Sequence, residues 1–330
     1  KSILDFGFYV SFFPQLVAGP IVRAADFIPQ LYKPYKLSQY NFGLALFWIL
    51  KGLIKKVIIG DYIAVNFIDR IFDNPMMFTG FENLMALYGY SLQVYADFSG
   101  YTDMAIGIAL LMGFTLPKNF NSPYKAQNVG EFWKRWHISL SGWLKDYLYI
   151  PLGGNRGGSV GTWIALIFIS AFIIMLSGKM IVLYGFIWST IIIAFLAIWI
   201  KPFRAWLTTN INLLITMLLG GLWHGASWQF VIWGGLNGLG LIVYKLWRKI
   251  SPYEKYDNAI AIVVKVFVTF NFITFTRIWF RAENMESTWQ IIGQIGTSFN
   301  ASLIPEILVS YSNVFAMMLL GFVIHWLPVK

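Results

Sequence analysis

The chain has 330 residues, of which 58% are hydrophobic, 18% are aromatic and only 12% are charged. This composition is too apolar for a soluble globular protein and is typical of an integral membrane protein. The formal net charge is +10, but the cations stand in short segments between apolar runs, so they indicate membrane orientation and predict no nucleic-acid partner. The absence of cysteine excludes disulfides, thiolate catalysis and zinc–thiolate sites.

Apolar segments long enough to cross a bilayer recur along the whole chain. In chain order they cover residues 3–22, 40–60, 84–115, 160–177, 180–200, 211–223, 227–247, 259–280 and 311–328. The first three and the segment at 211–223 are interrupted by polar residues or glycine. The pattern predicts an all-α fold, a polytopic transmembrane bundle of roughly eight to ten spanning or re-entrant helices.

No polar stretch is long enough to form a soluble domain, so we expect residues 1–330 to make one integral-membrane domain. The chain begins with Lys1 rather than Met and ends with Lys330 directly after an apolar run. We therefore expect a fragment or a processed chain.

The third apolar segment contains the sequence "YSLQVYADFSGYTDMAIG", whose polar residues are Gln93, Asp97, Ser99, Tyr101, Thr102 and Asp103. Isolated carboxylates are costly in lipid, so Asp97 and Asp103 should face the bundle interior or a watery cavity. We expect them to pair with cations such as Lys134 or Arg135, or with backbone donors. They can brace a helix kink at Gly100 or line a polar tunnel, and the two interpretations are compatible.

The polar segment 117–159 is rich in cations, with Lys118, Lys125, Lys134, Arg135, Lys145 and Arg156 against only Glu131 and Asp146. Because cytoplasmic segments carry an excess of Lys and Arg, we predict that this segment lies in the cytoplasm. The turn at Gly178 and Lys179 would then lie outside the cell.

Within that segment, "WKRWHISLS" spans Trp133 to Ser141. At 3.6 residues per turn, one helical face would hold Trp133, Trp136, His137, Leu140, Trp143, Leu144, Tyr147 and Leu148. The opposite face would hold Lys134 and Arg135, as in a helix that lies in the membrane interface. This pattern explains every residue except His137, for which structural hydrogen bonding and a functional role both stay open.

His224 lies in "LLGGLWHGASWQF", between two apolar runs. An ionised side chain at the bilayer centre costs about 3 kcal/mol or more, so an imidazole there is held neutral. A neutral imidazole can accept a proton from a hydroxyl or thiol near pH 7. His224 is therefore a candidate general base, and the alternative is a buried histidine that a backbone carbonyl satisfies.

The third histidine, His325, stands beside Trp326 near the end of the last apolar segment, which favours interface anchoring. The three histidines are far apart in sequence, and no group of acids has the spacing of metal ligands. We expect no metal site.

The run "DFSGYTDMAIGIALLMGFTLPKNFNSPYKAQNVGEFWKRWHISLSGWLKDYLYIPLGGNR", from Asp97 to Arg156, resembles the membrane-bound O-acyltransferase family, and within it the bacterial alginate O-acetyltransferase branch. The teichoic acid D-alanyl transferase is a more distant likeness. The same resemblance extends to "YVSFFPQLVAGPIVR" at 9–23, "GGLWHGASWQFVIWGGLNG" at 220–238 and "FTRIWFRAEN" at 275–284. Members of this branch usually carry further helices before the first of these stretches and often beyond the last helix. The resemblance therefore implies a chain that lacks helices at its N-terminal end and, as a second expectation, at its C-terminal end.

The resemblance implies a helical enclosure with re-entrant and interfacial helices around a central tunnel. His137 matches the family's first motif histidine, and His224 matches the histidine taken as catalytic. We expect substrate-binding or tunnel residues at Asp97, Ser99, Tyr101, Asp103, Trp133, Lys134, Arg135, Trp136, Trp223, Trp228 and Asn237.

The implied reaction is acyl transfer to a hydroxyl by a multi-pass enzyme of the bacterial cytoplasmic membrane. The expected donor is an acyl thioester, acetyl-CoA, that enters from the cytoplasm, and no permanently bound cofactor is expected. The acceptor would be a polysaccharide hydroxyl or a serine of an extracytoplasmic acetyltransferase. Two alternatives stay open: a non-enzymatic proton or solute transporter, and a lipid- or protein-acylating enzyme with a longer-chain donor.

Overall fold

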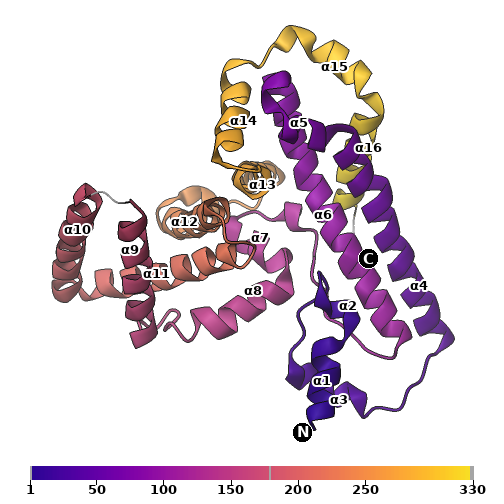
Figure 1. Ribbon diagram of the computed structural model, residues 1–330, viewed down its shortest axis with the longest axis horizontal. Helices are drawn as coiled ribbons and strands as arrows, with labels where there is room; N and C mark the ends of the chain where they lie inside the picture. The colour runs from indigo at the N-terminus through magenta and orange to yellow at the C-terminus, as the bar shows by residue number, and fades with distance from the viewer. Residues whose placement is uncertain (1, 178–179, 328–330) are drawn as a thin grey trace. The chain divides into compact units, whose positions relative to one another are not determined.

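The computed structural model describes residues 2–177 and 180–327 (Figure 1). Every regular element within these ranges is helical, which confirms the all-α fold. The chain divides into two compact units, Lys1–Ser141 with Pro252–Lys330 and Gly142–Ser251, and each is described by itself. The organisation as one domain stays a prediction, and the turn at Gly178 and Lys179 lies outside the described residues.

The first unit begins with three short helices, α1 (Ile3–Ser11), α2 (Phe13–Leu16) and α3 (Ala24–Leu31), in place of one apolar segment at 3–22. They pack against the end of α6 (Gly80–Leu111). The buried residues of this small core are Phe12, Val22, Phe27, Ala109 and Leu116. The aromatic rings of Phe27 and Phe114 stack with their centroids 5.0 Å apart. The N-terminal segment is thus fixed by its aromatic side chains.

The long helix α6 packs along α4 (Gln39–Leu53) and along the two π-helical segments η1 (Ile54–Asp61) and η2 (Ala64–Ile68), which α5 (Asp69–Asp73) follows (Figure 1). Gly52 and Gly100 allow this approach, because a Cβ atom on Gly52 would lie 2.4 Å from the carbonyl oxygen of Gly100. α6 continues through Gly100 without interruption. The helix is therefore not broken at Gly100, where the glycine serves close packing, and a kink at this position stays a prediction.

Two further short helices of the first unit, η4 (Pro123–Lys125) and α7 (Val129–Arg135), come before the second unit in the chain. After the second unit, the first unit continues with α13 (Ala259–Arg281), α14 (Met285–Thr297), α15 (Ile304–Ser310) and α16 (Ser312–Trp326). α13, α14 and α16 all contact α6. α6 is therefore the central helix of this unit. α8 (Ile138–Leu144) leads from the first unit into the second.

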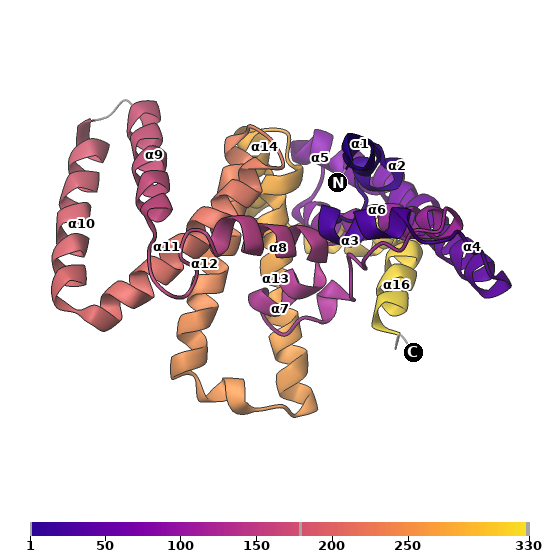
Figure 2. The same cartoon turned by 90° about the horizontal axis from the view of Figure 1, so that it is seen from below.

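The second unit continues from α8 through η5 (Lys145–Tyr149) to α9 (Val160–Ser177), α10 (Met180–Trp199), α11 (Lys201–Leu222) and α12 (Trp228–Ile250). Figure 2 shows α9 and α10 as neighbouring helices. α11 and α12 pack closely, because a Cβ atom on Gly234 would lie 2.3 Å from the carbonyl oxygen of Met217. Small residues thus bring the two helices that flank His224 together.

Three helices of the described chain are long and apolar enough to cross a membrane, at Pro202–Leu222, Trp228–Ile250 and Ala259–Arg281. A fourth candidate is the pair Ala301–Ser310 and Ser312–Trp326, whose axes differ by 87°. These helices confirm an integral membrane protein. The expected total of eight to ten spanning or re-entrant helices stays a prediction.

Candidate active site

His137 lies at a break between two helices. α7 ends at Arg135, and Trp136 is extended, with φ −105° and ψ 128°. His137 has a φ of 44°, in the left-handed region that a non-glycine residue adopts only at a cost. The single helical face predicted from Trp133 to Leu148 is therefore wrong, because the 3.6-residue period does not carry across this turn.

A neighbouring segment holds the His137 turn through backbone and side-chain hydrogen bonds. The amide of Ile138 donates to the carbonyl of Asn119 at 2.9 Å. The Asn119 Oδ1 atom lies 3.2 Å from Nδ1 of His137 and accepts from the amide of Ser139 at 3.1 Å and its hydroxyl at 2.9 Å. Asn119 and His137 are only 1% and 4% exposed. Asn119 was not predicted as a site residue. The sequence feature that could have indicated it is a polar residue within "LPKNFNSPYK", part of the run that carries the family resemblance.

Two further segments meet at this turn. The ring of Phe98, on α6, meets the imidazole of His137 edge to face with centroids 4.7 Å apart. The amide of Ile21 donates to the hydroxyl of Ser139 at 3.0 Å. The stretches at 9–23 and 97–156, which carry the family resemblance, therefore come together around His137.

Trp136, next to His137, packs on a buried cation that the sequence analysis did not single out. The guanidinium carbon of Arg277, on α13, lies 4.7 Å from the centroid of the indole ring of Trp136. Arg277 is 5% exposed and donates to the hydroxyl of Tyr124 at 2.6 Å and to the carbonyl of Ser91 at 3.3 Å. Within residues 2–177 and 180–327 no carboxylate pairs with it, so aromatic rings and neutral oxygens stabilise this charge. The sequence feature that could have indicated Arg277 as a site residue is its position inside an apolar segment.

Asp103 pairs with two lysines of the facing helical segment. Its carboxylate lies 2.6 Å from Nζ of Lys55 and 3.3 Å from Nζ of Lys51. Lys55 also donates to the hydroxyl of Ser99 at 3.2 Å, and Ser99 is fully buried. Both predicted residues face the interface of α6 with α4 and η1, as expected for polar groups inside a bundle.

Asp97 lies on the same helix, where Nζ of Lys56 is 2.5 Å from its carboxylate. Lys56 also pairs with Asp61 at 3.2 Å. The partners expected for the two aspartates, Lys134 and Arg135, are wrong. The lysines that replace them are Lys51 at the end of α4 and Lys55 and Lys56 in η1, all within the interrupted apolar segment predicted at 40–60.

The remaining predicted residues of the first unit are scattered. Arg135 pairs with Glu131 at 2.7 Å, one helical turn earlier, and Lys134 is exposed. Trp133 packs edge to face on Phe132, and Tyr101 is half-buried on α6. Among the predicted residues of this unit, Trp136 alone adjoins His137 in the chain.

His224 belongs to the second unit, in the turn between α11 and α12. Its amide donates to the carbonyl of Gly221 at 2.9 Å, and its ring meets those of Trp223 and Trp233 edge to face at 5.0 and 5.2 Å. Burial among these rings lowers the pKa of the imidazole to about 4. His224 is therefore neutral at pH 7, as the sequence analysis expected.

Of the other predicted residues of this unit, Trp223 and Trp228 flank the same turn, and Asn237 lies farther along α12. Trp223 and Trp228 are 56% and 47% exposed. Asn237 is 1% exposed, and its Nδ2 atom donates to the carbonyl of Trp233 at 2.9 Å, within α12. Trp233, which the sequence analysis did not list, thus links Asn237 to the ring of His224.

His325 is 5% exposed, so the prediction that it anchors the helix at the interface is wrong. Its Nε2 atom accepts from the amide of Tyr124 at 3.2 Å, and its ring packs on Tyr95. Trp326, half exposed beside it, is the residue suited to the interface.

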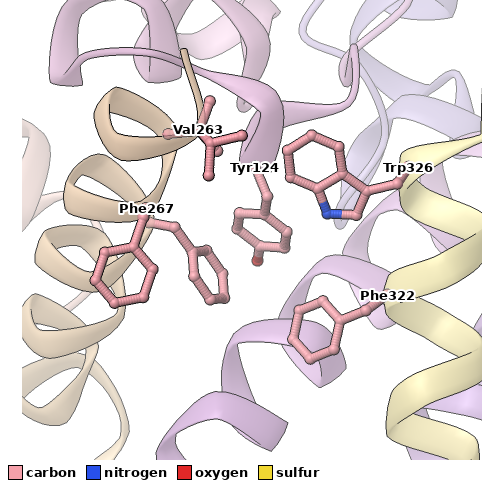
Figure 3. Close-up of a pocket in the computed structure, with 7 residues that line it drawn as sticks. Tyr124, Val263, Phe267, Phe322 and Trp326 are labelled. Carbon is pink, nitrogen blue, oxygen red and sulfur yellow. The ribbon is translucent and has the colours of Figure 1, made fainter. Parts of the chain in front are cut away.

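An apolar cavity of about 310 Å³ lies in the first unit, between α13 and α16 (Figure 3). Its lining residues are Tyr124, Val263, Val266, Phe267, Phe270, Phe322 and Trp326. None of the predicted site residues lines it. Among the described residues, no group of three or more His, Asp or Glu side chains has the arrangement of a metal site.

Comparison with known proteins matches residues 1–173 to the model of the membrane-bound O-acyltransferase family. The peptidoglycan O-acetyltransferase of Helicobacter pylori is 39% identical over 90% of this chain and 47% of its own length. A probable alginate O-acetylase of Azotobacter vinelandii is 37% identical over 88% of this chain and 47% of its own length. The teichoic acid D-alanyltransferase of Bacillus subtilis is 28% identical over 81% and 58%, respectively.

The chain spans about half the length of the first two of these relatives, since the alignments cover 47% of each. The family match covers more than half of the chain and includes His137 but not His224. It also includes Asn119 and the turn that Asn119 holds. The chain belongs to the membrane-bound O-acyltransferase family.

Proposed function

We propose that the protein is an O-acyltransferase that moves an acetyl group from a cytoplasmic thioester, acetyl-CoA, to the hydroxyl of a secreted or cell-surface polysaccharide. The observation that carries the proposal is the 37% and 39% identity, over about nine-tenths of the chain, to a protein named a probable alginate O-acetylase and to a peptidoglycan O-acetyltransferase. Both of these relatives are named for acetyl transfer to a polysaccharide. The family and the candidate membrane spans are consistent with this reaction.

His224 acts as the general base in this proposal. A nitrogen of the neutral imidazole takes the proton of the acceptor hydroxyl while the hydroxyl oxygen attacks the thioester carbonyl carbon. The tetrahedral intermediate then expels the thiolate, which leaves with the proton as a thiol, and the acetyl ester remains on the acceptor. The lowered pKa of His224, about 4, supports a base that is unprotonated at neutral pH.

His137 orients the substrate or stabilises the charge that develops on its carbonyl oxygen. Its burial and its hydrogen-bonded turn support this role, because a catalytic group must be held in a fixed orientation. Trp136 and the residues around Asp97 and Asp103 would shape a tunnel between the two membrane faces.

The protein would be a multi-pass component of the bacterial cytoplasmic membrane. The thioester donor would arrive at the cytoplasmic segment 117–159, where Lys118, Lys134, Lys145 and Arg156 are exposed. The acceptor would be the polysaccharide itself or a serine of an extracytoplasmic acetyltransferase that completes the transfer. No bound cofactor is part of this mechanism.

The test is His224→Ala in the full-length protein, with acetyl content of the secreted polymer as the measurement. Loss of the general base should lower acetylation by about 10²-fold or more while the protein still inserts and accumulates. The matched control is His325→Gln, since that histidine accepts one backbone hydrogen bond and has no proposed chemical role. Undiminished acetylation by the His224 variant would overturn the assignment.

The transporter alternative relies on titratable groups along a path through the membrane. In the first unit Asp97 and Asp103 are engaged by lysines at 2.5 and 2.6 Å, and this pairing favours a structural role for the two carboxylates. A deletion strain separates the alternatives, because acetyl loss is expected only for the acetyltransferase. A longer-chain transferase would instead change lipid or protein acylation.

A further inference from the structure

One oxygen atom of Asn119 receives three polar contacts, and one of them fixes its identity. The backbone amide of Ser139 can only donate, so the Asn119 atom 3.1 Å from it must be the carbonyl oxygen rather than the amide nitrogen. The orientation of the Asn119 side chain is thereby determined by the backbone. The same oxygen also accepts from the Ser139 hydroxyl at 2.9 Å.

The third contact is to Nδ1 of His137 at 3.2 Å. A carbonyl oxygen has no proton, so this contact is a hydrogen bond only if Nδ1 carries the hydrogen. We propose that Asn119 is a positioning residue that holds the hydrogen of His137 on Nδ1. In the neutral imidazole, which the 4% exposure of this ring favours, the lone pair then lies on Nε2. The partner of one ring nitrogen sets the state of the other, as in other histidine sites.

The remaining features of Asn119 agree with this role. Its Nδ2 atom is buried and has no hydrogen-bond partner among the described residues. All the bonding of the side chain is therefore concentrated on the one oxygen that faces His137. The carbonyl of Asn119 also accepts from the amide of Ile138, so both the backbone and the side chain of Asn119 hydrogen-bond to the strained turn.

The position of the hydrogen on His137 does not depend on the proposed function. Its consequence for acetyl transfer does rest on that function. A neutral imidazole with its hydrogen on Nδ1 has no donor at Nε2. Nε2 can then accept a hydrogen bond from a hydroxyl or thiol, but it cannot donate one to a developing oxyanion. Of the two roles proposed for His137, substrate orientation is selected over charge stabilisation.

The chain has only three histidines, which makes the tautomer directly measurable by ¹⁵N NMR of the full-length protein labelled at histidine. Spectra of His224→Gln and His325→Gln identify the signals of His137 by elimination. We expect the wild-type His137 to show a protonated Nδ1 and an unprotonated Nε2 at neutral pH. A protonated Nε2 with a bare Nδ1 would overturn the proposal without any variant of Asn119.

Two substitutions then test the cause. Asn119→Ala removes the acceptor, and the His137 signals should move toward a mixture of tautomers. Asn119→Asp keeps an acceptor oxygen of the same shape and adds a negative charge, so His137 should stay protonated at Nδ1 and bind a second proton at higher pH than in the wild type. The matched control is Asn121→Ala, an exposed asparagine two residues away, which should leave the His137 signals in place. Unchanged His137 signals in the alanine and aspartate variants would contradict the proposal.

Acetylation assays add the kinetic arm. At metal sites, removal of a partner that orients a ligating histidine costs about 10- to 100-fold, and we expect a loss of similar size for Asn119→Ala at all pH values. For Asn119→Asp the loss should grow as the pH falls, because the added charge favours the doubly protonated imidazole. If the His224 assignment fails, the NMR result still stands or falls by itself.

Discussion

The guanidinium carbon of Arg277 lies 4.7 Å from the centroid of the Trp136 ring, so a buried cation on α13 supports the residue that precedes His137. The rings of Tyr124 and Phe132 lie 5.2 and 6.0 Å from the same carbon. A planar guanidinium can stack on such rings while it donates to Tyr124 and Ser91. Arg277 therefore joins α13, α6 and the segment before the His137 turn.

Arg277→Lys is expected to destabilise the protein although it preserves the charge. The ammonium group cannot reproduce the stacking and the hydrogen bonds of the fork, and desolvated cation–π contacts are worth about 2 kcal/mol. The free energy of unfolding in detergent should fall by about this amount. The control is Arg281→Lys on the same helix, a side chain that is 28% exposed, pairs with Asp69 and lies 5.3 Å from the centroid of the Phe72 ring. A lysine can keep this partly solvated ion pair, so the stability should fall by about 1 kcal/mol or less. Equal losses in the two variants would contradict the role given to Arg277.

Asp103→Asn is expected to be among the more destabilising substitutions in the first unit. It would leave Lys55 as a charge without its carboxylate in a site where both side chains are mostly shielded, 17% and 10% exposed. Breaking a buried pair in this way costs about 3–5 kcal/mol, and partial exposure places the expected loss at the lower end. Thermal unfolding of the purified protein measures it.

Two further variants check that explanation. Asp97→Asn breaks a pair whose side chains are 42% and 37% exposed, so its effect should be about 1 kcal/mol or less. The double variant Lys55→Met with Asp103→Leu removes both charges of the more buried pair, while Lys51, which is 37% exposed, can be solvated by water. It should recover much of the stability. If it is as unstable as Asp103→Asn alone, charge burial is not the cause.

Apolar length predicted the long helices well, because a run of about 20 apolar residues has few other structures available in a membrane. The segment expected at 160–177 is α9, and the segment at 227–247 is α12 within three residues at its C-terminal end. Periodicity failed where tertiary contacts override it. At His137, hydrogen bonds to the segment of Asn119 hold the chain in a left-handed turn. The sequence around His137 does not indicate Asn119 as its partner.

The interaction partners of the predicted site residues could also not be predicted from the sequence. Asp97 and Asp103 were recognised as interior carboxylates, but their lysines lie on a π-helical segment about 40 residues earlier, as the 41 and 48 residues that separate the bonded pairs show. Pairing across such a separation depends on how α4 and α6 pack. Arg277 and Asn119 were not predicted for the same reason, because the contacts that define their roles are made with segments distant in the sequence.

The low pKa of His224 predicts how the proposed reaction depends on pH. Burial lowers this pKa from 6.5 to about 4, so the imidazole is unprotonated at pH 6 and above. Acetyl transfer limited by this base should be flat between pH 6 and 8 and should fall only as the pH approaches 4 to 5. The neutral imidazole is favoured by the fold, so its contribution to stability is present above pH 6.5 and is lost as the pH falls toward 4. Initial rates of the full-length enzyme in membrane vesicles, together with unfolding temperatures over the same range, measure both effects. A rate that halves near pH 6.5 would show that another group, or a solvated His224, controls the reaction.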